Sequence, residues 1–213
     1  GGSLDVDESL TLSGALSQSG GATIDVVQDK ILTYSGGAVN LGANTLTLNG
    51  KGTFSNTNAL VLNNADSLLS INDTITVGSA SVTAATNENK GLAVNASGTI
   101  SSLSVSADTS LNIANGITLA GAAEIAEGVT LTLNNTGTFG STLNLKGNLD
   151  VGATHTVSGL ISVGADASIS IPADIALNYS GGNLKVGDNT LSIGGAGTFN
   201  NATDSPLVLD LED

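Results

Sequence analysis

TLTLNGKGTF, at Thr45–Phe54, is a ten-residue segment that this chain of 213 residues contains in three versions. It returns as TLTLNNTGTF at Thr130–Phe139 and as TLSIGGAGTF at Thr190–Phe199. The first and third versions belong to a longer match, because YSGGAVNLGANTLTLNGKGTF from Tyr34 aligns without a gap with YSGGNLKVGDNTLSIGGAGTF from Tyr179. Such self-similarity is typical of an architecture that stacks copies of one structural unit.

The segment itself indicates a corner between two short strands. Leu46 and Leu48 alternate with threonines, and this period of two places both leucines on one side of a strand. Gly50 and Gly52 then permit a bend, because glycine tolerates backbone angles that other residues avoid. Phe54 begins a second inward-facing side.

The aromatic residues mark the repeat, since both tyrosines occupy one repeat position and all three phenylalanines occupy another. We expect Phe54, Phe139 and Phe199 to fill the same inward position, each nearly fully buried in a thin aliphatic core. Tyr34 and Tyr179 should likewise share one environment, with the hydroxyl reaching solvent or a turn.

Short alternating pairs of Leu, Ile and Val continue along the whole chain, separated by Gly, Asn, Asp and Ser. No window shows apolar residues at helical spacing, so helix should be essentially absent. Grouped in threes, the pairs give repeats of roughly 18 to 25 residues. We therefore predict an all-β fold, a parallel β-solenoid of about nine to eleven short rungs, as a single domain over residues 1–213. The alternative, a β-sandwich or jelly roll, has longer strands and needs no internal repeat.

The composition excludes several classes of partner. Five lysines and no arginine face 19 acidic residues, which gives a formal net charge of −14. This acidic balance disfavours nucleic acid and anionic lipid as partners. No stretch approaches the roughly 20 apolar residues of a membrane helix, so we expect no membrane insertion. The chain has no cysteine, which removes disulfides and thiolate metal sites.

No motif predicts chemistry, and we expect no enzyme, no catalytic residue, no cofactor-binding residue and no metal-binding residue. His155 is the only histidine and is expected on the surface of a strand. The acidic pairs Asp5/Asp7 and Glu124/Glu127, and the tail Asp210, Glu212 and Asp213, lack the aromatic platforms of a saccharide-cleaving groove. Incidental calcium at a turn or at the acidic tail is the one ion this pattern allows.

The sequence pattern of the whole chain is represented by Leu143–Ala153, LNLKGNLDVGA. It consists of short L-x-L and L-x-V strands, Asn-Gly turns and few charged residues. In this sequence pattern the chain resembles bacterial surface β-solenoids, namely autotransporter passenger domains and filamentous-haemagglutinin-type adhesins. The resemblance implies secretion to an extracellular or cell-surface location. It also implies a rod-like stalk or fibre with adhesion or self-association.

Two functions follow as expectations. In the first, the chain is a structural extracellular subunit or segment of a surface filament, layer or adhesin stalk, and it associates end to end into a filament or longer rod. Neither terminus reads as a cap, and LVLDL at Leu207–Leu211 looks like another strand. In the alternative, the chain is an adhesin binding module that recognises a host glycan or protein by a lateral face, with Tyr34 and Tyr179 as the candidate residues.

Overall fold

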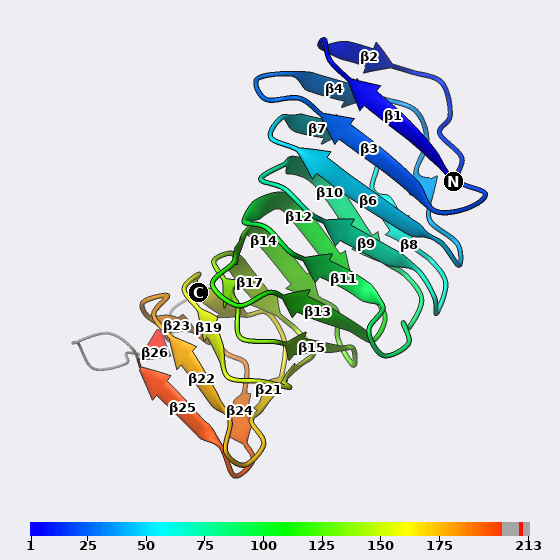
Figure 1. Cartoon of the computed structure of the whole chain (residues 1–213). Helices are drawn as coiled ribbons and strands as arrows, with labels where there is room; N and C mark the ends of the chain where they lie inside the picture. Colours follow the sequence, from blue (N-terminus) through cyan, green and yellow to red (C-terminus); the bar gives the residue numbers. More distant parts are fainter. Residues whose placement is uncertain (202–208, 211–213) are drawn as a thin grey trace.

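The computed structural model describes residues 1–201 and 209–210, and all regular structure in them is β-strand. The strands stack in parallel as a β-solenoid, with β1 and β2 at one end and β24 and β25 at the other (Figure 1). Ten strands follow one another on the first face, so the solenoid makes nine turns. On this face the shortest turn separates Leu131 from Leu149, and the two longest, of equal length, separate Ile24 from Leu48 and Ile169 from Ile193. The predicted fold class is confirmed.

Each rung, meaning one turn of the solenoid, has up to three faces. The first face consists of β1 (Gly2–Val6), β3 (Ala22–Val26), β6 (Thr45–Gly50), β9 (Leu68–Ile71), β11 (Gly91–Val94), β13 (Thr109–Ile113), β15 (Thr130–Asn134), β18 (Asn148–Val151), β21 (Ala167–Ser170) and β24 (Leu191–Gly194). The second consists of β2 (Leu10–Leu12), β4 (Ile31–Tyr34), β7 (Thr53–Asn56), β10 (Thr76–Val82), β12 (Gly98–Val105), β14 (Thr118–Ile125), β16 (Thr138–Phe139), β19 (His155–Val157), β22 (Ala176–Tyr179) and β25 (Thr198–Asn201).

The third face begins with β5 (Val39–Asn40) and β8 (Leu60–Leu62), and it continues through the C-terminal halves of the long strands β10, β12 and β14. It then follows β17 (Thr142–Leu145), β20 (Ile161–Val163), β23 (Leu184–Lys185) and β26 (Leu209–Asp210). The predicted strand LVLDL is thus seen as Leu209–Asp210, and its other residues lie outside the described part of the chain.

Columns of aliphatic side chains run the length of the interior. Leu46 pairs in register with Leu69, Leu69 with Leu92, Leu92 with Leu111, and Leu111 with Leu133. All five side chains are buried. Because side chains alternate along a strand, every second residue of each strand points inward. Successive rungs lie one strand spacing apart, so these inward side chains pack into a continuous narrow core.

The repeated segment builds a corner in the same way in all three versions. Its sixth residue has a positive φ each time: 87° at Gly50, 65° at Asn135 and 106° at Gly195. Its eighth residue is always glycine, and at Gly52 a β-carbon would lie 2.5 Å from the Val27 carbonyl oxygen. The corner therefore needs a residue with a left-handed backbone conformation, followed two positions later by a glycine, which has no side chain.

The three phenylalanines do not share one position, and this part of the prediction is wrong. Phe54 and Phe199 have matching neighbours, since each pairs with the leucine that lies two residues before the tyrosine of the preceding rung, Leu32 and Leu177 respectively. Phe139 instead pairs with Val157, which pairs with Tyr179, so it lies in the column of the tyrosine and not in that of Leu177 and Phe199. Phe54 and Phe139 are fully buried, but Phe199 is only half-buried, because β25 is the last strand of its face among the described residues.

The two tyrosines do share one environment. Both side chains are fully buried. The Tyr34 hydroxyl accepts a hydrogen bond from the Leu16 N–H at 3.0 Å, and the Tyr179 hydroxyl accepts one from the Ile161 N–H at 3.3 Å. Each ring also packs against the following phenylalanine, with centroid distances of 6.3 Å and 6.0 Å. In both cases the hydroxyl accepts a hydrogen bond from a backbone N–H of the preceding rung, in place of a backbone carbonyl, and it does not reach solvent.

We expect Tyr179→Phe to lower the free energy of unfolding by roughly 1 to 3 kcal/mol, because the Ile161 N–H would stay buried without an acceptor. Chemical denaturation measures the change. Tyr179→Leu, which also removes the ring, should cost more. Equal stability of Tyr179→Phe and the unmodified chain would contradict a role for this hydrogen bond.

Candidate functional site: the open first rungs

His155 is buried in the core, so the predicted surface position is wrong. Its side chain is 1% exposed, because His155 and Val157 alternate inward on β19, where His155 pairs with Leu177. Nδ1 lies 3.2 Å from the Asn135 carbonyl oxygen, whereas Nε2 is buried without a partner. A proton on Nδ1 satisfies that carbonyl and leaves only a lone pair on Nε2 facing the core. Burial accordingly lowers the pKa of His155, against the smaller opposing effect of the Asn135 carbonyl.

This burial predicts acid sensitivity. Because the pKa of folded His155 lies below its ordinary value of 6.5, the unfolded chain binds the extra proton more readily. The stability contributed by neutral His155 is therefore fully present above about pH 6.5 and is lost as the pH falls through the folded pKa. Tyr179 on the neighbouring strand stays protonated in this range, since burial raises its pKa.

We expect His155→Leu to flatten the dependence of unfolding free energy on pH between about pH 7 and pH 5. Parallel urea titrations of both proteins across this range measure it, and the difference isolates His155 from the 19 acidic residues. An unchanged slope in the variant would show that His155 is accessible to solvent.

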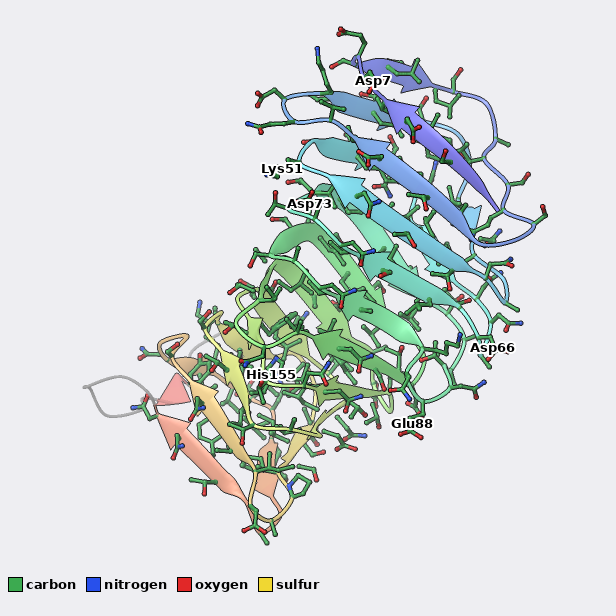
Figure 2. All side chains as sticks on the ribbon, viewed as in Figure 1. Asp7, Lys51, Asp66, Asp73, Glu88 and His155 are labelled. Atoms are coloured by element: carbon green, nitrogen blue, oxygen red, sulfur yellow. The ribbon has the colours of Figure 1, made fainter. Side chains whose placement is uncertain are left out.

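The acidic pairs do not assemble into a site. Glu124 lies on the outer surface of the third face, where Lys146 Nζ is 3.0 Å away and the Asn144 amide donates to the same carboxylate. Figure 2 shows the labelled Asp66, Asp73 and Glu88 on the outline of the molecule. Within the described residues no group of three or more acidic or histidine side chains could hold a metal ion. The side chains of the tail Asp210, Glu212 and Asp213 lie outside the described part of the chain.

One lateral groove of about 680 Å³ lies beside β13 and β15. Its wall includes the loop that contains Glu88 and Asn89, and the turns after β13, β15 and β18. Amide side chains dominate the lining, which includes Glu88, Asn89, Asn112, Asn115, Asn134 and Asn135. Tyr34 and Tyr179, the candidates for lateral recognition, are buried and cannot serve on this or any other outer surface.

The N-terminal end is an open rung. Among the described residues, β1 pairs with β3 alone and β2 with β4 alone, so one edge of each strand is unpaired. The third face has no strand at this level, because residues 13–21 cross it without pairing and β5 follows only in the second rung. Unpaired strand edges of this kind are templates for further pairing.

A cavity of about 390 Å³ opens into the core beside this incomplete rung. Its apolar lining comes from Leu4, Leu16, Ala22, Ile24, Val39 and Leu46. Leu4 and Leu16 are half-exposed, although the residues that follow Leu4 in its column are buried. Core surface that is covered elsewhere by the next rung is therefore accessible here.

Exposed apolar side chains gather at the two ends of the solenoid. Among the described residues, the strongly exposed large ones are Leu10 at 43%, Val27 at 41%, Ile31 at 45% and Ile193 at 43%. The first three belong to the first two rungs and Ile193 belongs to the last strand of the first face. Leu10 and Ile193 both lie in inward columns, opposite Leu32 and Ile169 respectively, and no strand of the described residues covers their outer side.

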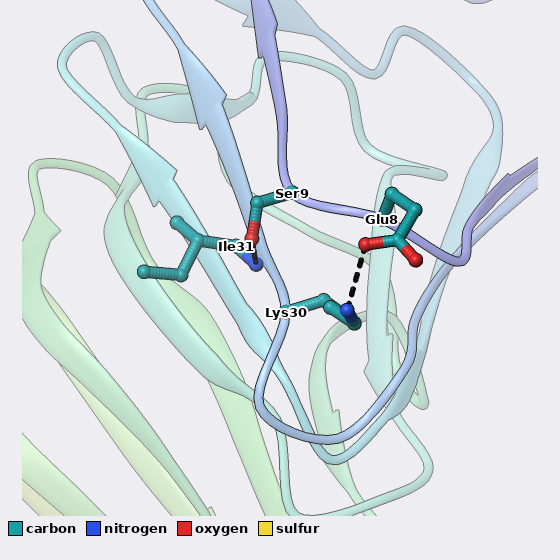
Figure 3. A network of polar contacts seen from close by, with 4 residues as sticks. All are labelled: Glu8, Ser9, Lys30 and Ile31. Carbon is teal, nitrogen blue, oxygen red and sulfur yellow. Dashed lines mark hydrogen bonds and ion pairs between the residues drawn. The ribbon is translucent and has the colours of Figure 1, made fainter.

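Charges surround this open end. Asp5, Asp7 and Glu8 are exposed there. Figure 3 shows Lys30 Nζ donating to Glu8 Oε2 at 2.7 Å, and the Ile31 N–H donating to Ser9 Oγ at 3.1 Å. The hydrogen bond and the charge of Lys30 lower the pKa of the Glu8 carboxyl. These contacts tie the first rung to the second at the corner, whereas Asp5 and Asp7 form no ion pair within the described residues.

Comparison of this chain with models of known protein families, with curated proteins and with solved structures gives no match. The described residues also contain no helix that is long and apolar enough to cross a membrane.

Proposed function

We propose that this protein is a non-catalytic structural element of an extracellular or cell-surface assembly, a rod-like subunit or segment that associates end to end. The uninterrupted first-face ladder from β1 to β24 carries this proposal, because a solenoid of stacked similar rungs forms a rod. The first described rung also leaves strand edges unpaired and the apolar side chain of Leu10 exposed, which is surface that a further rung or a second copy would cover.

The rest of the solenoid supports a structural role by its regularity. The ladder of the first face runs from β1 to β24, and the interior columns are almost entirely aliphatic. Each rung contacts only its neighbours, so adding rungs or copies lengthens the rod without a new kind of contact. The resemblance to bacterial surface β-solenoids favours the extracellular location.

Electron microscopy of the purified chain over a range of protein concentrations tests the proposal. We expect particles of constant width whose length grows in steps of one molecule. Labelling of intact source cells with an antibody tests the location, and labelling only after lysis would contradict it. Particles of one short length at every concentration would contradict end-to-end association.

The alternative is an adhesin module that binds a glycan or protein laterally, and the amide-lined groove favours it. Amide groups donate and accept hydrogen bonds, which suits a neutral, hydroxyl-rich ligand. Titration of neutral oligosaccharides against the chain tests this, with Asn115→Ala/Asn135→Ala as the variant and Asn58→Ala as a control outside the groove. Binding that the double substitution leaves unchanged would exclude the groove.

A further inference from the structure

We infer that Asn115 is a site of spontaneous covalent modification: the backbone nitrogen of Gly116 attacks the Asn115 side chain, and the residue becomes aspartate or isoaspartate. This inference does not depend on the proposed function. It rests on the turn of residues 114–117, between β13 and β14, and on a comparison with the other Asn-Gly pair of the chain, Asn49–Gly50.

The reaction consumes water and needs no other reagent. The Gly116 nitrogen, after losing its proton to a base in solution, bonds to Cγ of Asn115, the bond from Cγ to Nδ2 breaks, and ammonia leaves. The five-membered imide that results takes up one water molecule. Cleavage of the bond from the nitrogen to Cγ gives aspartate. Cleavage of the bond from the nitrogen to the main-chain carbonyl carbon gives isoaspartate, in which the chain continues through Cγ.

The turn leaves both reacting groups accessible. Asn115 and Gly116 are exposed, and a β-carbon added at Gly116 would have no atom within 4 Å. The Ile117 N–H donates to the Ala114 carbonyl oxygen at 3.0 Å and Gly116 has a φ of 74°, as in a type II turn. Glycine also has no β-carbon to crowd the attacking nitrogen.

The peptide group between Asn115 and Gly116 is the central one of this turn. Among the described residues, neither its N–H nor its carbonyl oxygen has a hydrogen-bond partner, and the Asn115 side chain has none either. The peptide group can therefore rotate toward the geometry of attack while the hydrogen bond that closes the turn stays in place. No contact between rungs has to open.

The strand β6 holds the second Asn-Gly pair. Asn49 and Gly50 are its last two residues, and Gly50 pairs in register with Val26 of β3. On the other side of β6, the Asn72 N–H donates to the Leu48 carbonyl oxygen at 3.0 Å. A β-carbon added at Gly50 would clash with the Val26 carbonyl, so this backbone lies directly against the preceding rung. Rotation of the Asn49–Gly50 peptide group therefore requires two rungs to separate.

This difference predicts unequal rates for two identical dipeptides. Local opening costs little in an exposed turn, but in a core strand it costs up to the full stability of the fold. In the folded chain we therefore expect Asn115 to be modified at least about ten times faster than Asn49. In the unfolded chain the two sites should react at similar rates.

The modification alters the lateral groove as well as the turn. Asn115 contributes to the lining of this groove of about 680 Å³, which also includes Glu88. Either product replaces a neutral amide with a carboxylate, and so adds one negative charge to the net charge of −14. Isoaspartate also lengthens the main chain of the turn by one carbon atom.

Incubation of the folded chain at mildly alkaline pH, with a parallel sample in guanidinium chloride, tests the inference. A protease that cleaves after lysine separates the two sites, because Lys51 and Lys90 lie between Asn49 and Asn115. Mass spectrometry of the peptides follows the gain of about 1 Da at each asparagine. Labelling by an isoaspartyl methyltransferase distinguishes isoaspartate from aspartate.

Asn115→Gln and Asn49→Gln are matched variants, since glutamine would have to close a larger and slower-forming ring. We expect Asn115→Gln to remove most of the methyltransferase labelling of the folded chain, and Asn49→Gln to leave it unchanged. An intact Asn115 after incubation of the folded chain would overturn the inference, and so would equal rates at Asn115 and Asn49. A rate difference that persists in guanidinium chloride would overturn the structural argument, because neighbours in the sequence would then be its cause.

Discussion

Phe54→Ala should lower the free energy of unfolding by about 3 to 5 kcal/mol, through lost transfer energy and the cavity left in the core. Phe54 is fully buried, lies between Leu32 and Val77 in its column, and packs against the Tyr34 ring. The neighbouring side chains are held in ladders, so they cannot collapse far into the space. Denaturant unfolding measures the total loss.

The loss should also be local. In a linear array, stability is close to a sum of rung terms and nearest-neighbour terms, so hydrogen exchange should quicken first in β4, β7 and β10. Phe199→Ala provides the comparison, since Phe199 also packs against a tyrosine ring but is only half-buried. A larger loss at Phe199 than at Phe54 would contradict the assignment of these two environments.

Gly52→Ala should cost roughly 2 to 4 kcal/mol, because the added methyl group meets backbone and not a flexible side chain. Its β-carbon would stand 2.5 Å from the Val27 oxygen and 2.6 Å from the Lys30 oxygen. The Lys30 oxygen accepts the ladder hydrogen bond of the Thr53 N–H at 2.9 Å. Relief of the clash therefore breaks or lengthens a bond between two rungs.

Gly37→Ala is the matched control. No atom lies within 4 Å of the β-carbon that this substitution adds, and the φ of Gly37 is not positive. It should change stability by less than about 1 kcal/mol, or stabilise slightly by restricting the unfolded chain. Equal losses in the two variants, measured by urea unfolding, would show that crowding at the corner is not the cause.

The candidate site was predictable only in outline. The sequence predicted unpaired strand edges at the ends, and among the described residues the outer edges of β1 and β2 are unpaired. It does not show that residues 13–21 leave the third face incomplete, because Leu16 fits the apolar pattern as well as Val39 does. The cavity arises from how the loop crosses the rung, and that depends on the Tyr34 hydroxyl holding the Leu16 N–H.

Register explains what sequence and structure each decided. The period of two and the paired glycines of the corner are local, so the sequence alone determined a solenoid of short parallel strands with Leu46, Leu48 and Phe54 inward. A slip of two residues between rungs keeps every inward side chain inward, so the same pattern fits several registers. The tertiary structure chose among them: it places Phe139 in the column of Tyr179 and His155 in the column of Phe199. Burial of a histidine and exposure of Ile193 depend on which strand lies one rung away, a contact between residues about 20 positions apart that no local pattern encodes.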